Sequence, residues 1–250
     1  MKRGKIYIGT SGWSYKAWAA EFYPENIKGT EQLRYYMQRF PTVEINATFY
    51  RLPEVKTIQT WHDKAPPHFI YAIKGSKSVT HYKRLKPGAR SFDILLERIQ
   101  ALGEHLGPVL WQLPGNFKKD AERLAAFLKR LPPQFHHALE FRHPSWLDSE
   151  TVNLLSQYGV ALVSLSSNVM PMDLTLTAPF TYIRFHGLEG GSAHDYTREE
   201  LQPWAEHLKS CAQKGITAFG YFNNDVNTRA PGNALLLAKM VENDRPDWEV

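Results

Sequence analysis

Short runs of β-branched and aromatic residues alternate along the chain with longer stretches in which apolar residues recur every three or four positions. The first pattern is typical of strands and the second of amphipathic helices. Strands are predicted over residues 5–10, 42–46, 68–74, 108–113, 136–142, 160–165, 180–186 and 217–223. Helices are predicted over residues 30–40, 54–65, 90–106, 119–131, 148–158, 197–214 and 231–242.

This order of elements indicates an α/β fold with a parallel sheet. Eight strands in 250 residues favour a (β/α)8 TIM barrel. An open, doubly wound sheet is the alternative, but the loop after the first strand, GTSGWS, lacks the G-x-G-x-x-G spacing of a dinucleotide site. Residues 166–178 are too short and too interrupted by proline for a crossover helix. We therefore expect one irregular TIM-barrel domain over residues 1–250, with about seven full helices.

Several predicted helices carry capping signals. Thr197 followed by Glu200 has the spacing of a capping box, and Asp148 precedes another amphipathic stretch. A glycine just after a helix often adopts the left-handed conformation that ends it. This role is predicted for Gly107, Gly159 and Gly215.

Alternate residues of a strand point to opposite faces, so in a barrel one set meets the helices and the other fills the interior. In the segment 42–46, Val43 and Ile45 are predicted to face the helices, and Glu44 and Asn46 the interior. In most of the strands, the inward residues are apolar or small at the start and polar at the C-terminal end. The inward set predicted for the sixth strand is Leu162, Ser164 and Ser166.

The C-terminal ends of the strands form the barrel mouth, where TIM-barrel enzymes carry their active sites. Six ionisable residues are predicted to meet there: Glu44, Lys74, Glu140, Arg142, Arg184 and His186. A buried charge without a partner costs several kcal/mol, so their coexistence needs a reason. One reason is a ligand carboxylate or phosphate, which arginine can bind with two hydrogen bonds. The other is an ion network that neutralises itself and closes the barrel.

In an enzyme, Glu44 or Glu140 is the candidate base and His186 the candidate acid, because the ordinary pKa of histidine lies near neutrality. Lys74 is the further catalytic candidate, able to polarise a carbonyl or bind an anion. Substrate-binding candidates at the same end of the barrel are Trp13, Asn46, Tyr50, Gln112, Arg142, Arg184, Asn223, Asn224 and Asp225.

A metal at this mouth would have Glu44, Glu140, His186 and Asp225 as ligands. The neighbouring arginines would repel a cation, and no H-x-H or H-x-x-x-H spacing supports the site. We therefore expect neither a metal nor another cofactor.

Charge and composition narrow the function only slightly. The formal net charge is +5 and no run of basic residues occurs, which suits a small anionic ligand and leaves nucleic acid possible but not favoured. The lone cysteine, Cys211, excludes a disulfide within the chain and a thiolate metal cluster. A cytoplasmic protein is expected, and no apolar run is long enough to suggest a membrane span.

Seven blocks of the sequence resemble the domain-of-unknown-function 72 family (YecE-like proteins). They occur in order between about residues 6 and 240 and read GTSGWSYKAW, VEINATFYRLP, FIYAIKGSKSVTH, GPVLWQLP, ALEFRHPSW, YIRFHG and YFNND. The resemblance implies an irregular TIM barrel, in agreement with the alternation of strand faces. It implies no reaction, because the family has no established one.

Our main hypothesis is an enzyme that acts by acid/base chemistry on a small phosphorylated or carboxylated polyhydroxy compound at the barrel mouth. One alternative is a phosphodiester-directed nuclease or nucleic-acid-binding protein. Another is a barrel that binds a ligand without catalysis. The residues leave open whether the protein is an enzyme.

Overall fold

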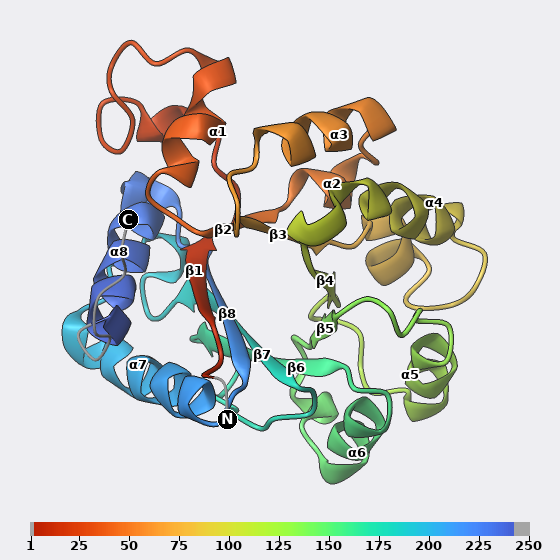
Figure 1. The fold of residues 1–250 in the computed structure, drawn as a ribbon. Helices are drawn as coiled ribbons and strands as arrows, with labels where there is room; N and C mark the ends of the chain where they lie inside the picture. The colour runs from red at the N-terminus through yellow and green to blue at the C-terminus, as the bar shows by residue number, and fades with distance from the viewer. Residues whose placement is uncertain (1–2, 243–250) are drawn as a thin grey trace.

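The computed structural model describes residues 3–242, which form a nearly closed ring of parallel strands surrounded by helices (Figure 1). The neighbour order is β1-β8-β7-β6-β5-β4-β3-β2. The strands are β1 Ile6–Thr10, β2 Thr42–Ile45, β3 Ile70–Lys74, β4 Leu106–Gln112, β5 His137–Glu140, β6 Ala161–Ser167, β7 Phe180–Gly187 and β8 Thr217–Phe222. This arrangement confirms the predicted barrel and excludes the doubly wound sheet.

Each predicted helix is present, with slightly different bounds for all but the segment 90–106, which forms a much shorter helix. They are α1 Gly29–Met37, α3 Val55–Lys64, α4 Arg90–Arg98, α5 Ala121–Leu128, α6 Ser149–Gln157, α7 Arg198–Gln213 and α8 Arg229–Glu242. A single turn, α2 Ala47–Tyr50, was not predicted, and residues 166–178 contain no helix, as expected. Among residues 3–242, no helix has the length and apolar character needed to cross a bilayer.

Most of the predicted helix caps are confirmed. Thr197 and Glu200 form the capping box of α7, and Gly159 and Gly215 have positive φ after α6 and α7. The prediction for Gly107 was wrong, because this glycine lies inside β4. A Cβ there would lie 2.5 Å from a side-chain carbon of Ile70, so the glycine is needed for close packing rather than for a helix cap.

The predicted helix 90–106 is two different elements. Arg98 ends α4, and the chain continues as the 3₁₀ segment η3, Ile99–His105. Gly103 breaks this segment with φ of 51° and ψ of −127°. Because such backbone angles suit glycine best, this residue turns the chain from the helix layer into β4.

The ring closes between β1 and β2 without a regular ladder. The two strands are linked by a bridge between Ser11 and Glu44, and a Cβ on Gly9 would lie 2.2 Å from the carbonyl oxygen of Thr42. The Tyr36 hydroxyl fills the gap. It accepts from the backbone N–H of Thr10 at 2.9 Å and donates to the carbonyl of Thr42 at 3.0 Å. One phenol thus replaces the hydrogen bonds that the two strands do not make to each other.

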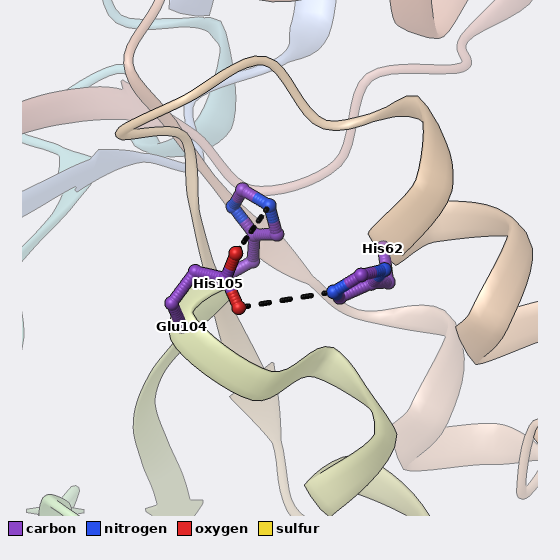
Figure 2. Close-up of side chains that lie close together, drawn as sticks. All are labelled: His62, Glu104 and His105. Carbon is purple, nitrogen blue, oxygen red and sulfur yellow. Dashed lines mark ion pairs between the residues drawn. The ribbon is translucent and has the colours of Figure 1, made fainter.

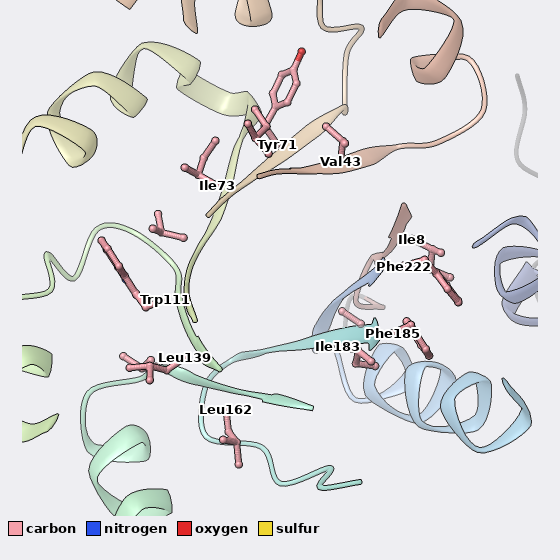
Figure 3. Packing of buried hydrophobic residues seen from close by; sticks show 14 of the residues in the cluster. Ile8, Val43, Tyr71, Ile73, Trp111, Leu139, Leu162, Ile183, Phe185 and Phe222 are labelled. Atoms are coloured by element: carbon pink, nitrogen blue, oxygen red, sulfur yellow. The ribbon is translucent and has the colours of Figure 1, made fainter. Parts of the chain in front are cut away.

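Two layers of buried side chains flank the strands. The outward layer packs against the helices and includes Ile8, Val43, Tyr71, Ile73, Trp111, Leu139, Leu162, Ile183, Phe185 and Phe222 (Figure 3). The inward layer fills the barrel with Tyr7, Ala72, Leu110, Ala138, Ala161, Val163, Leu165, Phe180, Tyr182, Phe219 and Tyr221. The alternation predicted from the sequence therefore holds in β2, β3, β4, β5, β7 and β8.

The face assignment of β6 was wrong. Val163 and Leu165 are in the inward layer, and Leu162 packs outward (Figure 3). The hydroxyl of Ser166 is 2.7 Å from the hydroxyl of Tyr196, which belongs to the outward layer. A tyrosine outside the barrel thus forms a hydrogen bond with a serine that the sequence pattern predicts to face the mouth.

Candidate functional site

A buried ion network built on Glu44 lies where β2 and β7 end. Arg184 donates from Nε to Oε2 of Glu44 at 2.9 Å and from Nη2 to Oε1 at 2.7 Å. The hydroxyls of Ser11 and Tyr182 donate to the same two oxygens, each at 2.7 Å. Burial opposes ionisation of Glu44, but the positive charges of Arg184 and Lys74 outweigh it and lower the pKa of the carboxyl.

Glu140 at the end of β5 joins two arginines. It accepts from Nη1 of Arg184 at 2.6 Å and from Nε of Arg142 at 2.6 Å. Burial again opposes the charge, and the two guanidinium groups hold the pKa of Glu140 well below its ordinary value. Both carboxylates are therefore ionised near neutrality, and each is held by arginine.

His186 lies beside this network as a neutral imidazole. Its Nε2 is 3.0 Å from Nη2 of Arg142 and 3.4 Å from Oε1 of Glu140, and the amide nitrogen of Asn223 is 3.1 Å from its Nδ1. Burial lowers the pKa of His186 to about 4. A guanidinium has only donors, so Nε2 accepts from Arg142 in the tautomer that carries its proton on Nδ1.

An open cavity of about 320 Å³ adjoins these side chains. Its lining includes Arg142, His186, Asn223, Ser192 and Asn168. Arg142 is the charged residue of this set, with 31% of its side chain exposed. A small polar molecule in this cavity would therefore meet the guanidinium of Arg142 and the imidazole of His186.

Lys74 ends β3 with its amine near the network but outside it. Its Nζ lies 4.5 Å from the centre of the Phe49 ring, and the His81 ring packs edge-on against the same phenylalanine. In the part of the chain that the structure describes, this amine forms no ion pair. Burial, together with the charge of Arg184, lowers the pKa of Lys74 to about 8.

A second polar group lies around β1 and β8. The carboxylate of Asp225 accepts from the indole nitrogen of Trp18 at 2.5 Å, and burial raises the pKa of Asp225 to about 6. Burial and the negative charge of Asp225 raise the pKa of Tyr15 to about 12, although a hydrogen bond with the Asn46 side chain opposes this rise. The carbonyl oxygen of the half-buried Asn46 side chain has no protein partner among the described residues.

The other predicted site residues pack against or hydrogen-bond to neighbouring parts of the protein. Asn224 is buried and donates to the carbonyl of His194 and to Asn233. Trp13 packs edge-on against Trp61, beside the outward layer of buried side chains. The exposed Tyr50 packs against Phe49, and the buried Gln112 ends β4 with its amide 3.4 Å from the carbonyl of Leu113.

Sequence reasoning did not assign Tyr182, His81 and Ser192 to the site. Tyr182 was recoverable, because it shares the inward face of β7 with Arg184 and lies one step below it. His81 and Ser192 lie in short helical turns, Ser78–Tyr82 and Gly191–Ala193, whose path no strand alternation predicts. The hydroxyl of Ser11, directly after β1, donates to Glu44 and so belongs to the buried network.

Comparison with known proteins gives a consistent result. The family model described as "Protein of unknown function DUF72" matches residues 7–249. UPF0759 protein YunF of Bacillus subtilis is 26% identical, with 95% of each chain covered. UPF0759 protein YecE of Escherichia coli K12 is 28% identical, with 81% of this chain and 80% of the relative covered.

Solved structures agree with this assignment. A DUF72 family protein from Thermotoga maritima superposes with a TM-score of 0.86 at 30% identity, covering 95% of this chain and 99% of that one. A DUF72 family protein from Enterococcus faecalis shares the fold, with a TM-score of 0.79 at 20% identity and 97% of each chain covered. The chain therefore belongs to the DUF72 family, a family of TIM-barrel-like proteins whose function is unknown.

Proposed function

We propose that the barrel mouth binds a small phosphorylated or carboxylated polyhydroxy compound and transfers a proton to or from it. The charge balance of the site carries this proposal. Glu44 and Glu140 offset the charges of Arg142 and Arg184, and Lys74 adds a positive charge that no described carboxylate pairs. An anion that meets Lys74 and the exposed part of Arg142 would supply the missing negative charge.

The residues of the network have different roles in this proposal. The oxygens of Glu44 are occupied by Arg184, Ser11 and Tyr182, so Glu44 positions the arginine instead of acting as a base. Arg184 is buried and holds both carboxylates, whereas Arg142 reaches the cavity. Arg142 is therefore the anion-binding residue, and His186 offers hydrogen bonds beside it.

Lys74 is the proton-transfer residue of this proposal. A pKa of about 8 leaves both the amine and the ammonium populated near neutrality, which is what a general acid or base requires. The carboxylates are weaker bases because of their lowered pKa values.

Ligand binding is tested by thermal shift with inorganic phosphate, ribose 5-phosphate and tartrate. We expect at least one of these to raise the Tm of the wild-type protein, and Arg142→Gln to abolish the shift. Arg90→Gln, an exposed arginine on α4, is the matched control and should respond like the wild type. Equal shifts in Arg142→Gln and the wild type, or no shift at all, would contradict the proposed anion site.

Catalysis is tested by incubating the ligand that binds in D2O and following its C–H signals by proton NMR. We expect the wild type to convert or deuterate it, and Lys74→Met to do so at least 100-fold more slowly. Lys77→Met, at a lysine whose amine lies over Tyr82, is the control. Binding without exchange or conversion would favour a non-catalytic ligand-binding barrel.

The phosphodiester alternative has less support. Metal-dependent cleavage needs carboxylate oxygens free to bind cations, and those of Glu44 and Glu140 accept from arginines. The carboxylate of Asp225 likewise accepts from the indole of Trp18.

A further inference from the structure

Three potential metal ligands converge at the end of the barrel opposite the mouth (Figure 2). His62 lies in the last turn of α3, and Glu104 and His105 end η3 just before β4 begins. Nε2 of His62 is 3.8 Å from one oxygen of Glu104, and Nε2 of His105 is 3.9 Å from the other. The ligand atoms of all three residues lie within 4.8 Å of one another.

The second nitrogen of each histidine has an acceptor of its own. Nδ1 of the buried His105 is 2.8 Å from the carbonyl oxygen of Phe69, and Nδ1 of His62 is 3.1 Å from a carboxylate oxygen of Asp63. A carbonyl and a carboxylate only accept, so these two contacts favour the tautomer with its proton on Nδ1; the amide nitrogen of Gln59, a donor, also lies 3.4 Å from Nδ1 of His62. In this tautomer the lone pair of each ring lies on Nε2 and faces Glu104. Metal-binding histidines are held in this way by carbonyl or carboxylate groups.

We propose that His62, Glu104 and His105 bind a divalent transition metal, with Zn²⁺ as the preferred ion. Two imidazole nitrogens and one carboxylate, with a fourth position left to water, form a known zinc ligand set. Metal–ligand bonds of about 2.0–2.1 Å in a tetrahedron place ligand atoms about 3.4 Å apart. Ligand atoms that lie up to 4.8 Å apart need a closure of up to about 1.4 Å, and the two nitrogen–oxygen separations to Glu104, 3.8 and 3.9 Å, need about 0.5 Å. Glu104 can make this movement, because 77% of its side chain is exposed.

The local backbone brings the three ligands together. The left-handed turn at Gly103 directs Glu104 and His105 toward α3, and a Cβ on Gly103 would lie 3.7 Å from the His62 ring. The ring thus lies over the glycine at ordinary contact distance. A bound ion would link α3 to the segment that leads into β4. At the N-terminal end of a barrel, such a link would stabilise the fold rather than take part in catalysis at the mouth.

The test uses the untagged full-length chain, stripped with EDTA, and zinc chloride as the probe. We expect calorimetry to show one equivalent of Zn²⁺ bound and the Tm to rise with its concentration, because the ion binds only the folded state. Co²⁺ should give the visible absorption of a tetrahedral site. Asp63→Ala, which removes the acceptor behind His62, should weaken zinc binding by about 10–100-fold.

Glu104→Gln and His62→Gln should each abolish the zinc-dependent rise in Tm. Glu97→Gln, at an exposed carboxylate on α4, is the matched control and should keep it. The Tm of each variant in EDTA shows whether it is folded, and the exposed Glu104 makes that variant decisive if His62→Gln is unstable. The proposal is overturned if the wild type binds no zinc, or if Glu104→Gln and Glu97→Gln bind it equally.

Discussion

Glu44 and Arg184 lie 140 residues apart in the sequence and form a two-pronged ion pair inside the barrel. Nε and Nη2 of the arginine each donate to a different oxygen of the carboxylate, and both side chains are almost fully buried. The remaining nitrogen, Nη1, donates to Glu140. Neither charge has water to replace its partner, so the geometry of the mouth depends on the whole set being present.

Glu44→Gln should lower the free energy of unfolding by about 3–5 kcal/mol, because the buried Arg184 would keep only Glu140, whose negative charge it shares with Arg142. Urea denaturation at neutral pH measures this loss. Glu25→Gln, at an exposed position, is the control and should change stability by less than about 0.5 kcal/mol. A loss below about 1 kcal/mol for Glu44→Gln would show that water reaches the network in solution.

Tyr36→Phe should open the closure between β1 and β2. Removing the hydroxyl leaves the N–H of Thr10 and the carbonyl of Thr42 without their partner, which costs about 1–3 kcal/mol. The amide of Thr10 should exchange with solvent faster in the variant, as hydrogen-exchange NMR would show. Tyr35→Phe, one residue earlier in α1, is the matched control. Equal exchange rates at Thr10 in the two variants would mean that another group takes over the contact.

Lys74→Met should stabilise the protein at pH 7 by about 1–3 kcal/mol. The pKa of Lys74 is about 8 in the folded state, below its ordinary value, so the fold opposes the charged amine. The unfolded chain binds more protons between pH 8 and 10.5, and wild-type stability should rise through that window.

In Lys74→Met this rise should disappear, whereas Lys77→Met should keep it. Denaturation curves from pH 7 to 10.5 give the comparison. Destabilisation by Lys74→Met would show that the lysine contributes to the fold.

The barrel was predictable because its signals are local. Each strand is a short β-branched or aromatic run, and helix ends such as Thr197 and Asp148 carry their own caps. The errors came where a distant residue decides the structure. Ser166 points outward and bonds to Tyr196, and Gly107 is required by the nearby Ile70.

The candidate site was predicted less completely than the fold. Strand alternation correctly directed Glu44, Glu140 and Arg184 into the mouth, since alternation is a property of the strand itself. It could not show which oxygen accepts from which nitrogen. It therefore could not separate Glu44, whose two oxygens are occupied, from Lys74, which forms no ion pair within residues 3–242. The group of His62, Glu104 and His105 was missed because helix α3 and segment η3 meet only in the folded chain.

His186→Asn should reduce the loss of folding stability that occurs as the pH falls below neutrality. The folded-state pKa of His186 is about 4, below its ordinary value of 6.5, so the unfolded chain binds more protons between these two values. Wild-type stability should therefore fall by about 2–3 kcal/mol more than that of the variant as the pH drops from 6.5 to 4. His68→Asn, at an exposed histidine, should lose stability like the wild type. An NMR titration of the imidazole gives the direct check. A measured pKa near 6.5 would mean that the ring is open to water and that Arg142 does not donate to it.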